Sequence, residues 1–424
     1  MSNAAALTSR PFQLDAAKVL TFAAPFMLAA GLAHFIFQAW HHWDVVTLDF
    51  RFFWLAGDFW TAGQSPYQPE FGVRADEQFA IKQGAIWYYP PSWFLIASAL
   101  SLGDPLVMSR IWLGVNCAFV LTSSWLNVAA FRTLADKNWL IDRRAPFTKL
   151  LLELSPWTLF AIHVGFLATT QAVGNTLHLG QSSALIYFGA SALAFGVVRK
   201  QNISAIAGLT ILMLKPQIGF MAVIALALSA FGRRTVFASA IASLIIAFPA
   251  ILIDTPVDIL TALVSGASQY NAQLYNLPEA MTGLRHIEWV LFQTSYSAGF
   301  YLGLCVLLVS AIVLAVRFFE LKLHPGEKLF LVFVTTLLVA PMHVYDFTLV
   351  GVFALAAISL RRPYAAISAS ALLALWRPGN IPHPEWLTSD AVIYYPGSFY
   401  ATIAVGAIFA ILVMTPFISA LREQ

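Results

Sequence analysis

Apolar segments that recur along almost the whole chain constrain its fold more than any other feature. A hydropathy pass finds twelve of them, at residues 17–38, 106–131, 147–170, 182–198, 202–214, 216–231, 235–253, 298–319, 327–341, 345–360, 363–376 and 398–420. The chain has 11% charged and 59% hydrophobic residues, whereas a soluble domain has roughly 25% charged residues. Since a membrane-spanning helix needs about 20 apolar residues, the sequence predicts an all-α polytopic membrane protein. We expect a single integral membrane domain, residues 1–424, with about twelve transmembrane helices.

The distribution of lysine and arginine predicts which loops lie inside. With the N-terminus inside and the twelve segments alternating, 17 of the 24 basic residues fall in inner loops, as the positive-inside rule requires. The outer loops are then residues 39–90, 254–297 and 377–397. The short apolar segment 91–103 must not cross fully, because a crossing would move the basic residues of 132–149 outside. We therefore predict that it is re-entrant or interfacial.

The first outer loop is the most polar part of the chain. Residues 39–91 hold six acidic and three basic residues together with many aromatic residues. Aromatic and charged side chains of this kind concentrate where a membrane protein meets the bilayer surface. The loop is therefore predicted to form amphipathic interfacial helices and to hold a polar ligand at the membrane surface.

Asp49 is the leading catalytic candidate in this loop. Its aromatic neighbours desolvate the carboxylate, which raises its pKa and makes it a better proton acceptor near neutral pH. If residues 49–62 are helical, Asp49, Phe53 and Trp60 share one face and the acid points toward the core. The alternative is that Asp49 is a helix N-cap or a solvated interfacial charge. Asp58, nine residues later, is about half a turn out of phase and is a substrate-binding candidate rather than a partner of Asp49.

Lys215 is the second candidate. It precedes Pro216 between two apolar segments and is the only charged residue between Lys200 and Arg233. A lone cation at membrane depth is costly and suggests a function, and a phosphate is a natural partner for it. The alternative is that the lysine extends to the interface and serves no site.

His343 and Asp346 form a third candidate pair at a predicted outer turn. They are three residues apart, so the carboxylate can orient the imidazole if the turn is helical. Asp346 can instead cap the start of the next helix. We keep both interpretations open at this point.

Two further groups give weaker signals. Gly180-Gln181 opens the segment that begins at residue 182, where exposed backbone amides favour an anion, although a plain helix cap explains the same residues. Arg285, His286 and Glu288 lie in the second outer loop and can bind hydroxyl groups of an acceptor, or can simply form a solvated surface. No spacing is typical of a metal site, and we expect no cofactor.

Several classes of function find no support in the sequence. There is no phosphate-binding loop of the nucleotide-binding kind, and no external basic patch that would indicate nucleic-acid binding. Cys117 and Cys305 lie inside apolar segments and are expected to be small buried hydrophobic residues. No internal repeat of the kind found in many secondary transporters is visible.

A series of short motifs nevertheless resembles a known family. In chain order they are Asp49 with the aromatic residues after it, Ala56, Gly63, Pro66-Tyr67, Tyr89-Pro90-Pro91, Trp112, Asn116, Gly180-Gln181, Lys215-Pro216, Pro341, His343 and Tyr345-Asp346. Their order and spacing resemble glycosyltransferase family 87, membrane mannosyltransferases of the GT-C fold that use polyprenyl-phosphate sugars. The resemblance covers residues 45–220 well and rests on few residues afterwards. One departure is Ser182-Ser183 after Gln181, where many relatives have an asparagine, and it bears on the choice of donor or acceptor.

The resemblance implies a reaction and a set of roles. It implies an inverting transfer of a sugar, a hexose such as mannose, from a polyprenyl-phosphate donor to a hydroxyl group of a glycolipid or glycan acceptor. The reaction would take place at the outer face of the bacterial cytoplasmic membrane. Asp49 would be the general base and His343 a second catalytic group, and Lys215 and Gln181 would hold the donor phosphate. The substrate-binding candidates are Asp58, Tyr67, Tyr89, Asp346 and Arg285.

Two other classes of protein compete with this interpretation. A transporter or flippase of lipid-linked sugars would need charges along a path at the midplane and often internal symmetry, and the sequence has few intramembrane charges and one large outer loop. A non-enzymatic scaffold would give no reason to bury Lys215. The expected partners are therefore the lipid-linked donor, the acceptor and the surrounding membrane lipids.

Overall fold

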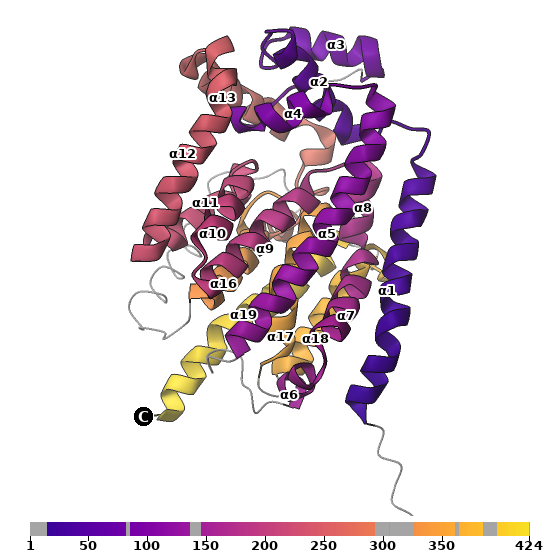
Figure 1. Cartoon of the computed structure of the whole chain (residues 1–424), viewed down its shortest axis with the longest axis vertical. Helices are drawn as coiled ribbons and strands as arrows, with labels where there is room; N and C mark the ends of the chain where they lie inside the picture. The colour runs from indigo at the N-terminus through magenta and orange to yellow at the C-terminus, as the bar shows by residue number, and fades with distance from the viewer. Residues whose placement is uncertain are drawn as a thin grey trace, which may run out of the picture.

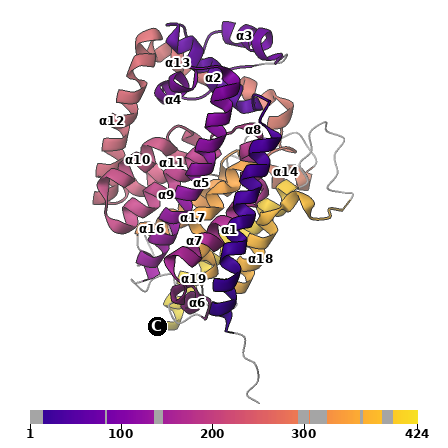
Figure 2. The ribbon, with the colours of Figure 1, turned by 45° about the vertical axis from the view of Figure 1, so that its right-hand side comes forward.

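The structure of the chain is a computed structural model that describes residues 15–81, 85–135, 146–292, 305, 325–360, 364–384 and 397–423. Within these residues the chain forms α-helices and short 3₁₀ helices, with a single β-bridge between Thr282 and Met342. The predicted all-α class is therefore confirmed. Figures 1 and 2 show an elongated bundle of helices.

The helices follow one another closely along the chain. In order they are α1 Ala16–His41, α2 Leu48–Thr61, α3 Glu70–Phe79, η1 Pro91–Trp93, α4 Phe94–Leu100, α5 Pro105–Ala135, α6 Pro146–Glu153, α7 Pro156–Ala168, α8 Gln171–Leu179, α9 Ser183–Arg199, α10 Asn202–Leu212, α11 Pro216–Ala227, α12 Ala230–Ile253, α13 Pro256–Ala272, η2 Leu274–Asn276, α14 Leu284–Phe292, α16 Pro325–Val339, η3 Val344–Leu349, α17 Val350–Ile358, α18 Tyr364–Trp376, η4 Pro378–Asn380 and α19 Gly397–Glu423.

Three of the described helices, α1, α5 and α12, are long and apolar enough to cross a membrane. Most other apolar segments form shorter helices of 10–17 residues. The segment 298–319 lies outside the described residues, apart from Cys305, so the expected number of about twelve spans stays a prediction. The apolar character of the helices supports a membrane protein.

The segment 147–170 is not the single helix that its hydropathy predicted. It forms α6 and α7, whose axes differ by 113°. The hydroxyl of Ser155 accepts a hydrogen bond from the backbone N–H of Thr158 at 3.0 Å, and Pro156 occupies the first helical position. A serine N-cap followed by proline starts a new helix, so a local capping signal overrides the continuous apolar pattern.

The polar first loop folds into a layer at one end of the bundle. Figure 1 shows α2, α3, α4 and α13 together at the end opposite the start of α1 and the C-terminus. The segment 91–103 contains η1 and α4, and the 7 residues of α4 span only about 10 Å at 1.5 Å per residue. A Cβ atom on Gly57 of α2 would collide with the carbonyl oxygen of Ala97. Helix α4 is thus short and packs closely on α2, which agrees with the prediction that this segment does not cross by itself.

Aromatic side chains join this layer to the bundle. Phe53 of α2 stacks on Trp93, with ring centroids 4.7 Å apart, and packs near Trp112 of α5 at 6.1 Å. The indole N–H of Trp93 donates to the carbonyl of Leu214 at 2.8 Å, and that of Trp112 donates to the carbonyl of Gly180 at 2.9 Å. Buried tryptophan supplies apolar area and needs one hydrogen-bond acceptor. Here the two acceptors are the residues just before Lys215 and Gln181, so the aromatic core fixes the backbone beside both candidates.

Candidate active site

Asp49 lies in the first turn of α2 and faces the interior of the protein. The N-cap of α2 is Thr47, so Asp49 is not the cap that the alternative interpretation required. Its carboxylate accepts a hydrogen bond from the side-chain amide of Gln181 at 2.5 Å. Burial raises the pKa of Asp49 to about 6, while the Gln181 hydrogen bond and the charge of Lys215 act in the opposite direction. At neutral pH this carboxylate is therefore mostly ionised and is a stronger base than an ordinary aspartate.

The backbone at Gly180 brings Gln181 to Asp49. Gly180 ends α8 in the left-handed conformation, with φ of +71°, rather than opening the next helix as its position suggested. A Cβ atom there would collide with the hydroxyl of Thr47, which lies at the start of α2. Glycine adopts this conformation without steric strain and permits the close approach. The turn therefore sets Gln181 directly against α2.

Replacing Gly180 by alanine is expected to destabilise the protein and to separate Gln181 from Asp49. The left-handed conformation alone costs an alanine about 1–2 kcal/mol, and the collision with Thr47 adds to it. Gly63 is a matched control, because its φ is +68° and no atom lies within 4 Å of its Cβ position. Thermal unfolding in detergent should show a larger fall in Tm for Gly180→Ala than for Gly63→Ala, and equal falls would contradict the role of close packing.

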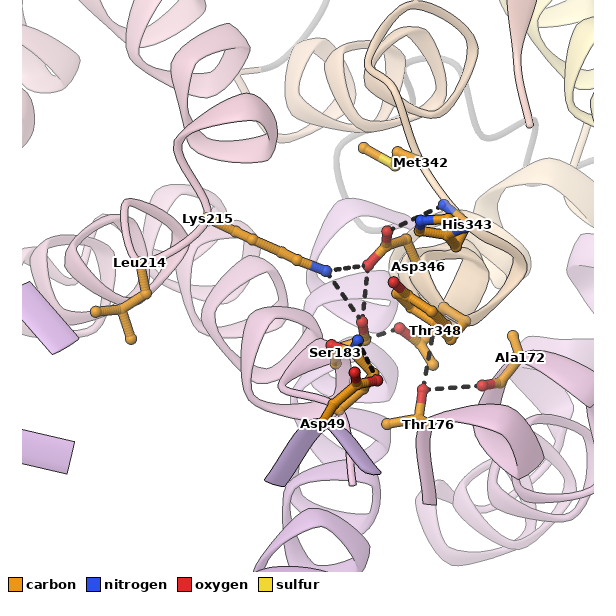
Figure 3. A network of polar contacts seen from close by, with 12 residues as sticks. Asp49, Ala172, Thr176, Ser183, Leu214, Lys215, Met342, His343, Asp346 and Thr348 are labelled. Atoms are coloured by element: carbon orange, nitrogen blue, oxygen red, sulfur yellow. Dashed lines mark hydrogen bonds and ion pairs between the residues drawn. The ribbon is translucent and has the colours of Figure 1, made fainter. Parts of the chain in front are cut away.

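Lys215 and Asp346 form a buried ion pair beside Asp49. The ammonium Nζ lies 2.6 Å from Asp346 Oδ1, and both side chains are almost fully buried. The hydroxyl of Ser183 donates to the same carboxylate oxygen at 2.7 Å, and Figure 3 shows Lys215, Ser183 and Asp346 converging above Asp49. The ammonium also lies 5.2 Å from the ring centre of Tyr345. Lys215 is thus held inside the protein and does not extend to a solvated surface.

His343 is oriented by a different partner from the one predicted. The Asp346 carboxylate accepts a hydrogen bond from the backbone N–H of His343 at 3.3 Å, and the His343 side chain accepts one from the backbone N–H of Asp346, so the two residues form a capping box at the start of the 3₁₀ helix η3. The ring nitrogen Nε2 instead lies 3.0 Å from Asn276 Oδ1. Burial lowers the pKa of His343 to about 4. The capping interpretation is confirmed, and the imidazole is neutral at pH 7.

A cavity of about 370 Å³ lies between Asp49, Gln181 and His343. Its wall includes four of the predicted site residues, Asp49, Gln181, Tyr89 and His343. The rest of the wall is largely apolar or aromatic and comprises Leu48, Phe52, Ile81, Ile86, Trp87, Tyr88, Asn175, Leu179, Gln273, Tyr275, Asn276, Ala280, Val344 and Tyr345. A pocket with an apolar wall and a few convergent polar groups is the usual form of a small-molecule site. Lys215 and Asp346 lie behind this wall.

The other predicted site residues do not line the cavity in the part of the chain that the structure describes. Tyr67 supports the wall from behind, because its hydroxyl donates to the carbonyl of Tyr89 at 2.8 Å. Asp58 forms an ion pair with Arg74 at 2.9 Å on an exposed face. Arg285 is buried in α14, with its guanidinium 3.2 Å from the Met281 sulfur. Asp58 is thus remote from the Asp49 carboxylate, as the helical phase predicted.

Several polar residues of the wall were not predicted from the sequence. Asn175 on α8 and Asn276 in η2 are the clearest examples. Both stand outside any charged or glycine-rich motif, and no local pattern marks them as functional. Ser183 was noticed only as a departure from the family pattern, and the structure shows it bound to Asp346.

The structure thus combines a bundle of apolar helices, typical of a membrane protein, with a cavity whose wall carries an acidic residue, Asp49. The family model of glycosyltransferase family 87 matches residues 87–341, which is more than half of the chain. The chain therefore belongs to glycosyltransferase family 87. No curated protein and no solved structure matches it. The matched region contains Tyr89, Gln181 and Lys215, begins after Asp49 and ends just before His343.

Proposed function

We propose that the protein transfers a sugar, a hexose such as mannose, from a polyprenyl-phosphate donor to a hydroxyl group of a glycolipid or glycan acceptor. The observation that carries the proposal is the Asp49 carboxylate. It is held by Gln181 at 2.5 Å in the wall of a largely apolar cavity, and burial raises its pKa to about 6. A general base is most effective when its pKa lies near the working pH.

In the proposed reaction Asp49 takes the proton of the acceptor hydroxyl as that oxygen attacks the anomeric carbon. The bond from this carbon to the phosphate oxygen breaks, and its electron pair leaves with the polyprenyl phosphate. Attack opposite the leaving group inverts the anomeric configuration. Because the leaving group is already a stable anion, the enzyme contributes mainly positioning and charge stabilisation rather than acid catalysis.

The surrounding groups suit the two parts of such a donor. The aromatic and aliphatic wall near Trp87 and Tyr88 offers apolar contact for the lipid. Gln181 offers a side-chain N–H group to the phosphate, and His343 lines the same cavity with its ring held on Asn276 at 3.0 Å. Lys215 lies behind the wall, and its positive charge would attract the phosphate. The ion pair with Asp346 weakens this attraction. We assign donor-phosphate binding to Gln181 and Lys215 on this basis.

The proposed orientation places the site at the outer face of the cytoplasmic membrane. Asp49, Lys215 and His343 were all expected on the outer side from the distribution of basic residues. Because the three residues lie within one network (Figure 3), a site at the outer face would contain all of them. A lipid-linked donor would then reach the cavity sideways from the bilayer.

The rate of transfer should depend on a single ionisation near pH 6. Asp49 accepts a proton only when ionised, and its pKa is raised to about 6. The value of kcat/KM should therefore be level above this pH and fall about tenfold per pH unit below it. A pH profile between about pH 5 and 8 measures this, and the residual activity of Asp49→Asn should lack the inflection. An inflection near pH 4 would contradict a desolvated base.

The direct test is a transfer assay with purified protein in nanodiscs. The protein is given polyprenyl-phosphate-mannose labelled in the sugar and a membrane glycolipid extract as acceptor. Movement of label into a new lipid or glycan supports the proposal. No transfer from a panel of polyprenyl-phosphate sugars would overturn it, and a flipping assay on the same nanodiscs would then test the transporter alternative.

A further inference from the structure

A second cavity, of about 310 Å³, borders α8 next to the Asp49 cavity. Its wall is formed by His34, Gln38, Thr170, Gln171, Gly174, Asn175, His178, Arg377 and Asn380. Asn175 belongs to the walls of both cavities. The two spaces are therefore neighbours, and one amide side chain borders both.

The wall of this second cavity differs chemically from that of the first. It is built from amide, imidazole, hydroxyl and guanidinium groups and contains neither an aromatic ring other than imidazole nor a carboxylate. Side chains of this kind bind hydroxyl groups by donating and accepting hydrogen bonds. Its volume lies within the range of small-molecule sites. Such a wall suits a strongly hydroxylated ligand and offers nothing to a polyprenyl chain.

Two polar stripes face each other across the cavity. On α8 the residues Gln171, Gly174, Asn175 and His178 share one face at helical spacing. On α1 the polar pair is His34 and Gln38, one turn apart, and no other polar side chain occurs between Phe22 and Ala39. Polar residues inside an apolar membrane helix are costly and usually serve a site.

The wall is held in place by hydrogen bonds among its own elements. His34 is fixed between the carbonyl of Ala168, 2.6 Å from Nδ1, and the Gln38 amide, 3.2 Å from Nε2. The backbone N–H of Gly379 donates to Gln171 Oε1 at 2.9 Å, which ties η4 to α8. These hydrogen bonds hold α1 against α7 and η4 against α8, so the side chains around the cavity are positioned before a ligand binds.

Gly174 lies in the cavity wall directly opposite His34 and Gln38. A Cβ atom there would meet His34 Cε1 at 3.4 Å and Gln38 Nε2 at 3.8 Å. A methyl group therefore fits, but any larger side chain would extend between the two polar stripes. A large side chain at this position would therefore occupy the space between His34 and Gln38 on α1 and the polar face of α8.

We infer that the second cavity binds the glycan part of the acceptor, in the form of a chain of several sugars that reaches past Asn175 to place its terminal hydroxyl group at Asp49. The inference rests on the proposed function. It extends that function by specifying an acceptor longer than one sugar and by assigning its site to the facing polar stripes of α1 and α8. The donor lipid would then occupy the first, apolar cavity, and the acceptor glycan would occupy the second.

The test compares a short and a long sugar as soluble probes. Binding of methyl α-mannoside and of a methyl mannotrioside is measured on purified protein in nanodiscs without donor, by titration calorimetry. The trioside is expected to bind at least about tenfold more tightly, which corresponds to 1.4 kcal/mol, because its additional hydroxyl groups make further hydrogen bonds to the polar wall. Equal affinity for the two probes would overturn the inference.

Gly174→Phe fills the cavity and is expected to remove the advantage of the trioside. Gly114→Phe is the matched control, because Gly114 is an exposed helical glycine of α5 with no atom within 4 Å of its Cβ position. Should Gly174→Phe not fold, Asn380→Leu at the exposed rim is expected to weaken trioside binding alone. The inference would also be overturned if these variants still bound the trioside more tightly than methyl α-mannoside by the same factor as the parent protein.

The same proteins separate this inference from the proposed function. Transfer from polyprenyl-phosphate-mannose is measured with the two probes as acceptors, and Gly174→Phe should raise KM for the trioside while the KM for the donor stays unchanged. If the trioside binds as expected and no sugar is transferred from any donor, the proposed function fails while the glycan site stands. If transfer occurs without preference for the trioside, the glycan site fails alone.

Discussion

Asp49→Asn is expected to lower the rate of sugar transfer by about 10²- to 10⁴-fold, the usual contribution of a positioned general base. Asparagine has nearly the same shape, and its carbonyl oxygen can accept the hydrogen bond that Gln181 now donates to Asp49 at 2.5 Å. The substitution therefore removes the proton acceptor without disturbing the wall of the cavity.

The same variant is expected to fold at least as well as the parent protein. The folded-state pKa of Asp49 is raised to about 6 by burial, so ionisation of this group disfavours the folded state at neutral pH. Removal of the charge should leave Tm at pH 7 unchanged or higher. As the pH falls through about 6 this gain should shrink, and it should be gone below the ordinary aspartate pKa of 3.8, where the carboxyl is protonated in both the folded and the unfolded state.

The matched control is Asp44→Asn, the same chemical change in the same outer loop. Asp44 is 88% exposed and contacts Arg110 at 3.3 Å, away from the cavity wall. Its variant should transfer sugar at the parental rate. If Asp49→Asn kept more than about a tenth of the parental rate, general-base catalysis by Asp49 would be excluded, since such a base contributes at least about a hundredfold.

Lys215→Met should destabilise the protein by about 3–5 kcal/mol, because removal of one partner leaves an uncompensated buried charge. The remaining charge is Asp346, whose side chain is 4% exposed. Thermal unfolding in detergent should show a marked fall in Tm. The exposed pair of Arg74 and Asp58, at 2.9 Å, is the control, and Arg74→Met should cost no more than about 1 kcal/mol.

A second substitution distinguishes loss of a charge pair from loss of packing. In the double variant Lys215→Met, Asp346→Asn the stranded carboxylate is gone, so most of the lost stability should return. If the double variant is as unstable as Lys215→Met, the ion pair is not the source of the effect.

Loss of Lys215 should also move the pH profile of transfer. The charge of Lys215 lowers the pKa of Asp49, and that of Asp346 raises it. The inflection in kcat/KM should therefore move to higher pH in Lys215→Met and move back in the double variant. A purely structural lysine would change Tm and leave the inflection where it is.

The sequence predicted the class of fold from local patterns. Outside residues 298–319, each predicted apolar segment coincides with a helix or with a pair of helices. The helical phase of Asp49 and Phe53 was also predicted, because it depends on residues a few positions apart. The bend between α6 and α7 was missed, although Ser155 and Pro156 are a recognisable signal for a new helix.

The site was only partly predictable. Asp49, Lys215 and His343 were identified because charged or titratable residues stand out against an apolar sequence. Their partners were not identified in the same way. The pairing of His343 with Asn276 spans 67 residues, and no local spacing connects those two positions.

The sequence by itself determined that this is a helical membrane protein, which loops carry the basic residues, and which few polar side chains lie next to apolar segments. These properties follow from hydropathy and helical periodicity, which act over a few residues. Tertiary structure decided that Gln181 meets Asp49 across 132 residues and that Lys215 meets Asp346 across 131. It also decided that polar stripes of α1 and α8 enclose a second cavity. These contacts depend on how whole helices pack, and on backbone details such as the left-handed turn at Gly180, which no short-range pattern specifies.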